Sequence, residues 1–126
     1  MVRGLPGSGK STFATELANA LDCNHFEHDQ YLYTEDGEYL WTPSRMAYAY
    51  RQCLRDTENT MAEGEPVVVS NVFPTGKSMK NYRKLAEKYG HRVTYIVVEN
   101  RRGGQNIHDV PQEALDDMRK AFQIQI

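Results

Sequence analysis

The sequence contains few cysteines and no long apolar run. Cys23 and Cys53 are the only two cysteines among 126 residues, and their spacing matches no metal-binding motif. Without a secretory signal, such a pair is typical of reduced thiols in an intracellular protein. No run of apolar residues approaches a membrane-spanning length of about eighteen. We therefore expect a soluble, cytoplasmic protein.

A strong excess of charge of either sign is also missing. The chain has 15 Lys and Arg against 17 Asp and Glu, a net charge of −2. This balance disfavours a strongly basic nucleic-acid binder, although a local basic patch is enough for an enzyme that acts on a nucleic-acid end. Internal repeats and low-complexity tracts are absent, and the length suits one compact domain. We expect a single domain over residues 1–126.

A complete phosphate-binding motif lies near the start of the chain. Residues 4–12 read GLPGSGKST, which fits the pattern G-x-x-x-x-G-K-[ST]. Glycines let the backbone turn tightly and bring its N–H groups onto phosphate oxygens, and the N-terminus of the following helix faces the same anion. Lys10 can reach the β- and γ-phosphates, and the hydroxyl of Ser11 can bind Mg²⁺. The residues expected to bind the nucleotide are Gly7, Ser8, Gly9, Lys10, Ser11 and Thr12.

The segments beside this motif favour phosphate binding over a glycine-rich turn without a ligand. The apolar start before the motif has room for about three strand residues, so we expect either a very short first strand or a chain trimmed at its N-terminus. A helical pattern follows the motif. Its expected inner face is Phe13, Leu17, Ala20 and Leu21.

The rest of the chain alternates short strands with helices, which predicts a parallel sheet covered by helices. The expected strands are residues 25–28, 67–69 and 92–98. The expected helices run from Pro43 to a stop at residues 64–66, over 77–89 with Gly90 as the stop, and onward from Pro111. The inner face expected for the helix from Pro43 is Met46, Ala47, Tyr50, Cys53, Leu54, Thr57 and Met61. The fold class is α/β, a three-layer P-loop kinase-like domain with a small parallel sheet flanked by helices.

Asp29 is the expected general base. Phosphoryl transfer to a hydroxyl often uses a carboxylate that accepts the hydroxyl proton in the transition state. Asp29 follows an expected short strand, and ligands of such sheets bind at the carboxyl ends of the strands. The alternative is that Asp29 caps a turn. We expect His25 and His28 to pack or lie at the surface and not to bind a ligand.

The strand that contains the apolar run at residues 67–69 ends in Ser70-Asn71, a place where P-loop proteins often carry an aspartate that holds Mg²⁺ or its water. This chain has no acid there. Asn71 can accept a hydrogen bond from a metal-bound water through its amide oxygen, but it brings no charge.

Two arginines in a late loop are candidates for a lid over residues 100–110. Arg101 or Arg102 could swing over the γ-phosphate and stabilise the charge that develops there, with Gly103-Gly104 as the hinge. The alternative is a solvated basic loop.

Four aromatic residues lie close together in the sequence, near the expected acceptor site: Tyr31, Tyr33, Tyr39 and Trp41. They could stack on the bases of a nucleic-acid acceptor. Packing is the favoured interpretation, because aromatic side chains dominate cores in general.

Taken together, these segments resemble the small P-loop kinases related to phage polynucleotide 5′-kinase and the kinase-like domains of NEDD4-binding-protein-2-like proteins. The motifs that carry the resemblance are the loop at 4–12, Asp29-Gln30-Tyr31, Gly37-Glu38-Tyr39, Ser70-Asn71, NIHDVP at 106–111 and Met118. They span nearly the whole chain, and NIHDVP ahead of a helix is the most selective of them. A phage origin would suit the compact size and would place the protein in the host cytoplasm.

The resemblance implies a four- or five-stranded parallel sheet with a lid, ATP as the phosphoryl donor and a 5′-hydroxyl of DNA or RNA as the acceptor. By position, Lys10 and Ser11 bind phosphates and Mg²⁺, Asp29 matches the acceptor-activating aspartate, and Arg101 or Arg102 falls in the lid.

Two positions depart from the phage kinases. Leu32 stands where those kinases have an arginine that grips the acceptor phosphate, and Asn71 stands where they have an aspartate that supports this arginine. The donor half of the resemblance is therefore intact and the acceptor half is changed. We expect an ATP-dependent kinase that transfers the γ-phosphate to a hydroxyl of a polynucleotide end, a nucleoside or another small molecule. The alternatives are a nucleotide-binding regulatory or interaction module with little turnover, and an ATPase that uses water.

Overall fold

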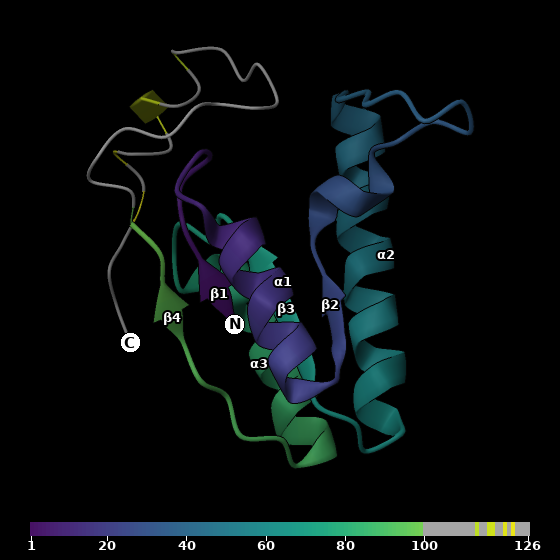
Figure 1. Cartoon of the computed structure of the whole chain (residues 1–126), viewed down its shortest axis with the longest axis vertical. Helices are drawn as coiled ribbons and strands as arrows, with labels where there is room; N and C mark the ends of the chain where they lie inside the picture. The colour runs from purple at the N-terminus through teal and green to yellow at the C-terminus, as the bar shows by residue number, and fades with distance from the viewer. Residues whose placement is uncertain (100–112, 114–115, 118–119, 121, 123–126) are drawn as a thin grey trace.

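The computed structural model describes residues 1–99, 113, 116–117, 120 and 122. Its strands form a four-stranded parallel sheet in the order β2-β3-β1-β4 (Figure 1). The strands are β1 (Val2–Arg3), β2 (Asn24–Phe26), β3 (Val67–Asn71) and β4 (Ile96–Val97). The first strand is short, with two residues.

The longest strand, β3, lies inside the sheet. Val68 and Val69 are buried, as expected of an apolar run that is covered on both faces. Val2 pairs with Ser70 on one side of β3, and Phe26 pairs with Val69 on the other. Because all pairings are parallel, the carboxyl ends of β1, β2 and β3 meet at one edge of the sheet.

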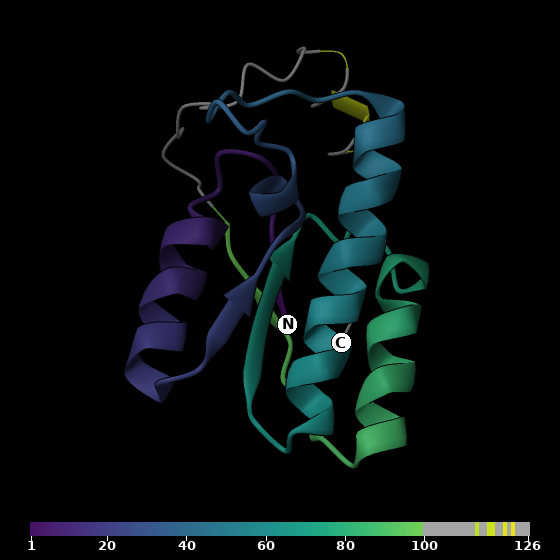
Figure 2. The same ribbon diagram turned by 90° about the vertical axis from the view of Figure 1, so that its right-hand side faces the viewer.

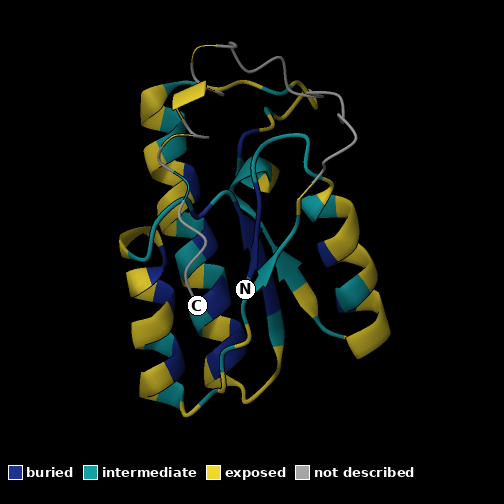
Figure 3. Ribbon diagram, turned by 90° about the vertical axis from the view of Figure 1, so that its left-hand side faces the viewer, coloured by how far each residue is buried: buried dark blue, intermediate teal, exposed yellow. Residues whose placement is uncertain are grey.

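Helices cover both faces of this sheet. In Figure 2, α1 (Lys10–Leu21) lies on one side of the strands, and α2 (Pro43–Ala62) and α3 (Lys80–Tyr89) lie on the other. Each side has its own group of buried residues (Figure 3). Under α1 these are Val2, Ala14, Ala18 and Val68, and under α2 and α3 they are Cys53, Val69, Phe73, Met79 and Tyr82. The expected three-layer α/β fold is confirmed.

The inner face of α1 differs in part from the prediction, although Leu17 packs against the core as expected. Ala14 and Ala18 are buried, whereas Phe13 and Leu21 are exposed. Alanines one helical turn apart let the helix axis come close to the sheet, which the short loop between β1 and α1 requires. Hydrophobicity alone selected the larger side chains and missed this steric condition.

Helix α2 begins as predicted, but part of its expected inner face is wrong. Thr42 caps the helix by accepting a hydrogen bond from the Arg45 N–H at 3.1 Å, and Pro43 is its first residue. Ala47 and Tyr50 are exposed. The buried positions are Ala49, Cys53, Thr57, Thr60 and Met61, a stripe that includes two threonines whose hydroxyls bond to the preceding turn.

Other expected boundaries are shorter in the structure. The strand predicted at 25–28 ends at Phe26, and the chain then forms a 3₁₀ turn, η1 (His28–Tyr31). The strand predicted at 92–98 is reduced to Ile96–Val97. The helix predicted over 77–89 splits into a 3₁₀ turn, η2 (Lys77–Met79), and α3, which ends at Gly90 as expected. The bounds of the helix expected from Pro111 lie outside the described residues.

A buried arginine ties the central strands together near the edge where they end. Arg3 of β1 has no exposed surface, and its Nε donates to the carbonyl oxygen of Phe73 at 2.9 Å. Phe73 has a left-handed backbone with φ 44°, which is uncommon outside glycine. These contacts hold the segment after β3 against β1. Within the described ranges, no helix is both long and apolar enough to cross a membrane.

Candidate nucleotide-binding and catalytic site

The phosphate-binding loop connects β1 to α1, as the motif requires. Gly9 precedes α1 with φ 90°, a left-handed conformation that favours glycine, and α1 begins at Lys10. Gly4 is needed for a different reason, since a Cβ there would clash with the Ser8 side chain and lie 2.8 Å from the Val98 carbonyl oxygen. The Ser8 hydroxyl is buried and has no hydrogen-bond partner among the described residues. An orphaned donor in such a loop fits a phosphate oxygen.

Lys10 lies among acids at this edge of the sheet. Burial lowers the pKa of Lys10, and the negative charges of Asp29 and Glu27 oppose that shift. Both carboxylates come from the segment just after β2, so the parallel sheet brings them to the phosphate-binding lysine. An ammonium group next to two carboxylates is suited to balance the charge of nucleotide phosphates on one side and of an acceptor site on the other.

Asp29 is held by a tyrosine of the following hairpin. The Tyr39 hydroxyl donates to Asp29 Oδ1 at 3.0 Å. Tyr39 also pairs with Tyr33 across an antiparallel bridge, with ring centroids 5.5 Å apart. Burial, together with the charge of Asp29, raises the pKa of Tyr39, so this hydroxyl stays a neutral donor. The turn therefore presents a carboxylate whose orientation is fixed.

The structure gives Asn71 a contact that the sequence did not predict. Asn71 is 6% exposed, and its Oδ1 accepts the His28 N–H at 2.7 Å. The amide thereby fixes η1, the 3₁₀ turn that carries Asp29. Leu32 has no exposed surface, so it belongs to the core and does not replace a phosphate-gripping arginine.

His28 packs against aromatic residues, as expected. Its ring makes edge contacts with Tyr50 at 4.4 Å and with Phe73 at 6.3 Å between centroids. Burial lowers the pKa of His28 to about 4. The imidazole is therefore neutral at physiological pH and adds no positive charge beside Asp29.

This buried histidine predicts a loss of stability in acid. Between pH 6.5 and about 4 the unfolded chain protonates His28 and the folded chain does not, so the free energy of unfolding falls as the pH falls. His28→Phe keeps the aromatic packing and removes the proton. Between pH 7.5 and pH 4, we expect the wild type to lose about 3 kcal/mol more of its unfolding free energy than His28→Phe loses. Urea unfolding at the two pH values measures this difference. Parallel pH profiles for the two proteins would contradict the prediction.

Glu27 is a site residue that the sequence analysis missed. Its Oε2 accepts hydrogen bonds from the Ser11 hydroxyl at 2.8 Å and from the Ser70 hydroxyl at 3.0 Å. His25 Nε2 lies 2.6 Å from the same Ser70 hydroxyl. The signal that could have found Glu27 is that it is an acid near the end of an expected strand, two residues before Asp29. It was overlooked because the predicted strand included it.

The magnesium ion that this fold implies fits the residues present. The Ser11 hydroxyl, the carboxylate of Glu27 and nucleotide phosphates are all oxygen donors, which Mg²⁺ prefers. Among the residues that the structure describes, no three His, Cys, Asp or Glu side chains gather into a metal site of their own. Magnesium that binds with a nucleotide typically takes several of its ligands from the phosphates and from water.

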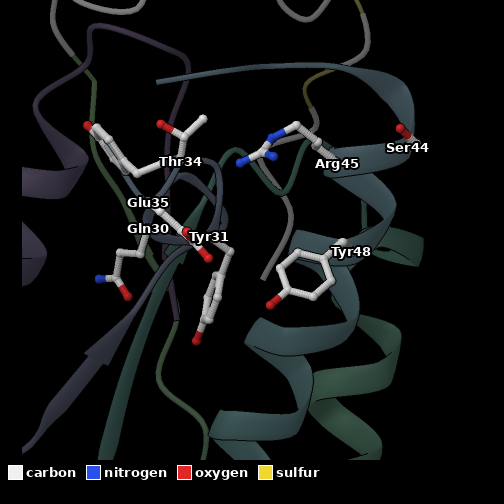
Figure 4. A pocket seen from close by; sticks show the side chains of 8 residues that line it. Gln30, Tyr31, Thr34, Glu35, Ser44, Arg45 and Tyr48 are labelled. Carbon is white, nitrogen blue, oxygen red and sulfur yellow. The ribbon is translucent and has the colours of Figure 1, made fainter. Parts of the chain in front are cut away.

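A cavity of about 570 Å³ opens next to η1, the turn that carries Asp29. Residues just after Asp29 and residues of α2 face each other across it, as Figure 4 shows. It is lined by Gln30, Tyr31, Tyr33, Thr34, Glu35, Ser44, Arg45 and Tyr48. Arg45 Nε donates to the Leu40 carbonyl oxygen at 3.0 Å, which sets the direction of the guanidinium.

The four clustered aromatics have separate positions. The Tyr31 hydroxyl donates to Asp56 at 2.6 Å and its ring packs against the core, so the packing interpretation holds for this residue. Tyr39 holds Asp29, while Tyr33 and Trp41 are exposed. Arg101 and Arg102, with the rest of the expected lid, lie outside the described residues. Cys23 and Cys53 are both free thiols.

The chain is similar to known proteins over almost its whole length. A model of the AAA_33 family, described as an AAA domain, matches residues 1–124. Uncharacterized protein PM0531 of Pasteurella multocida (strain Pm70) is 31% identical over 132 residues, a match that covers 94% of this chain and 72% of that protein.

Solved structures show the same fold at low identity. A chain of the Pnkp1/Rnl/Hen1 RNA repair complex superposes with a TM-score of 0.74 at 17% identity, covering 97% of this chain and 42% of that chain. APS kinase CysC of Mycobacterium tuberculosis gives 0.58 at 15% identity, covering 95% and 92%. A gluconokinase of Sinorhizobium meliloti 1021 gives 0.59 at 21% identity, covering 97% and 73%. The chain thus spans less than half the length of the RNA-repair chain that it matches.

Proposed function

The chain belongs to the AAA_33 family of AAA domains, and from that premise we propose that it is an ATP-dependent kinase that transfers the γ-phosphate to a hydroxyl acceptor. The acceptor that we propose is the 5′-hydroxyl of a polynucleotide or the hydroxyl of a nucleoside. The observation that carries the proposal is the position of Asp29, held by Tyr39 and close enough to Lys10 for their charges to interact.

The proposed reaction uses these residues in a simple order. Lys10 and the loop N–H groups hold the phosphates of ATP. The acceptor oxygen attacks the γ-phosphorus, the bond from that phosphorus to the bridging oxygen breaks, and ADP leaves. The hydroxyl proton passes to the carboxylate of Asp29. Ser11 would hold Mg²⁺, which neutralises charge on the phosphates when bound. Arg101 or Arg102 is proposed to close over the γ-phosphate from a lid at 100–110.

The cavity after Asp29 is the proposed acceptor pocket. Its tyrosines offer flat faces for a base or sugar ring, and its arginine offers a positive charge for a phosphate. Arg45 thus takes over the role that an arginine at Leu32 plays in the resembling kinases. Glu35 on the opposite wall leaves the pocket without a net charge, which suits a single phosphate better than a polyanionic one.

Removing the Arg45 side chain should weaken binding of the acceptor and leave binding of ATP unchanged. For Arg45→Ala we expect the KM for the acceptor to rise about tenfold, since one charge-assisted hydrogen bond is lost, with an unchanged KM for ATP. Arg51→Ala is the matched control, because Arg51 is exposed on the same helix and does not line the pocket. Equal acceptor KM values for the two variants would contradict the assignment of the pocket.

The proposed activity is tested with Mg²⁺, γ-labelled ATP and a panel of 5′-hydroxyl DNA, 5′-hydroxyl RNA, nucleosides and water. Label in one acceptor, and none with Asp29→Asn, is the expected result. Release of phosphate to water alone would make the protein an ATPase. Nucleotide binding without transfer to any acceptor would favour a regulatory module, the function that the departures at Leu32 and Asn71 also suit.

A further inference from the structure

One carboxylate oxygen of Glu27 accepts hydrogen bonds from two serine hydroxyls. Ser11 Oγ and Ser70 Oγ both donate to Glu27 Oε2, at 2.8 and 3.0 Å. Because the Ser70 proton points at Glu27, the His25 Nε2 that lies 2.6 Å from Ser70 must carry the proton of that contact. His25 therefore donates to Ser70, and both serines donate to Glu27, which acts only as an acceptor.

This arrangement fixes the orientation of the Ser11 hydroxyl. A hydroxyl has one proton and two lone pairs, and the Ser11 proton is engaged by Glu27. The lone pairs are left for another partner, and a divalent metal cation is a partner that such an oxygen binds. A carboxylate that orients a metal ligand in this way usually changes metal affinity by about 10–100-fold when it is removed.

The end of β3 supplies no carboxylate of its own. Neither Ser70 nor Asn71 supplies a negative charge, and the Asn71 amide oxygen accepts from the His28 N–H. Ser70 uses its hydroxyl proton to hold Glu27. In P-loop proteins the end of this strand often provides the acid. Here Ser70 of β3 instead holds Glu27, which follows the neighbouring strand β2.

We propose that Glu27 is the carboxylate of the metal–nucleotide site, which orients Ser11 as a ligand of the divalent cation and makes the site selective for the metal complex of the nucleotide. The inference rests on the proposed nucleotide binding and does not depend on the acceptor. A side chain that is 17% exposed keeps its charge partly out of water, so that charge is felt strongly at the phosphates.

The effect of Mg²⁺ on the ADP affinity of a Glu27 variant separates a role at the metal site from a structural role. Glu27→Gln keeps an acceptor oxygen for Ser11 and Ser70 and removes the charge. With Mg²⁺ present, we expect the affinity for ADP to fall about tenfold or more. With EDTA in place of Mg²⁺, we expect it to stay equal or to rise, since a negative charge near the phosphates has gone. Calorimetric titration of ADP measures both values without requiring catalysis.

Glu63→Gln is the matched control, because Glu63 is exposed at the far end of α2. Thermal unfolding of the unliganded proteins shows whether each variant folds. If Glu27→Gln weakens ADP equally with and without Mg²⁺, or changes neither value, the role of Glu27 is overturned while nucleotide binding stands. If the wild type binds no ADP under either condition, nucleotide binding itself is overturned and this inference with it.

Discussion

Lys10→Ala is expected to reduce the affinity for ATP by at least about a hundredfold, or about 2.7 kcal/mol, while the fold is retained. The ammonium group is the positive charge that the motif places on the β- and γ-phosphates, and alanine offers no substitute. Burial already lowers the pKa of Lys10, so the unliganded protein gains little from its charge apart from the attraction of Asp29 and Glu27. The loss should therefore appear in binding and not in stability.

The measurement is a calorimetric titration with ATP and Mg²⁺, together with circular dichroism and thermal unfolding. Lys80→Ala serves as the control, since it removes the same charge from an exposed position at the start of α3. A well-folded Lys10→Ala protein with wild-type ATP affinity and turnover would contradict the assignment of the phosphate-binding loop. It would also remove the basis of the proposed kinase.

Asp29→Asn is expected to reduce kcat by about 10²–10⁴-fold with little change in ATP affinity. Asparagine keeps the shape of the side chain and its oxygen can still accept from the Tyr39 hydroxyl, so η1 should be preserved. What is lost is the ability to take a proton from the acceptor. Single-turnover transfer of labelled phosphate, alongside ATP titration, separates these two effects.

Tyr39→Phe is the matched variant for this test. It retains the ring that packs edge-on against Tyr33 and removes only the hydroxyl that donates to Asp29. We expect a smaller fall in kcat than for Asp29→Asn, because the base remains but loses its orientation. Transfer at the wild-type rate in Asp29→Asn would show that Asp29 supports the turn and does not act as the base.

Local patterns were enough for the elements whose signals are local. The motif at 4–12 required a strand before it and a helix after it, and β1 and α1 occupy these places. Val67–Asn71 was recognisable as a buried strand, and the cap at Thr42 and the stop at Gly90 were in the expected places. These features depend on backbone conformation and on neighbours along the chain.

Features that depend on distant contacts were missed or wrong. Burial of Ala14 and Ala18 in place of Phe13 follows from how closely α1 approaches the sheet. The engagement of Asn71 follows from the pairing of β2 beside β3, which places the His28 N–H within 2.7 Å of its side chain. No periodicity within either segment contains that information.

The sequence by itself determined the phosphate-binding loop, the α/β fold and Asp29 as the candidate base, because each rests on short-range spacing. Only the tertiary structure decided which acid accepts the hydrogen bond of the Ser11 hydroxyl. Glu27 and Ser11 are 16 positions apart in the sequence and meet because of the parallel sheet. It also decided that Leu32 is core and that Arg45 faces the cavity after Asp29. The physical reason is that charge and hydrogen bonding act over a few ångströms in space, and the sheet brings together strand ends that the sequence keeps apart.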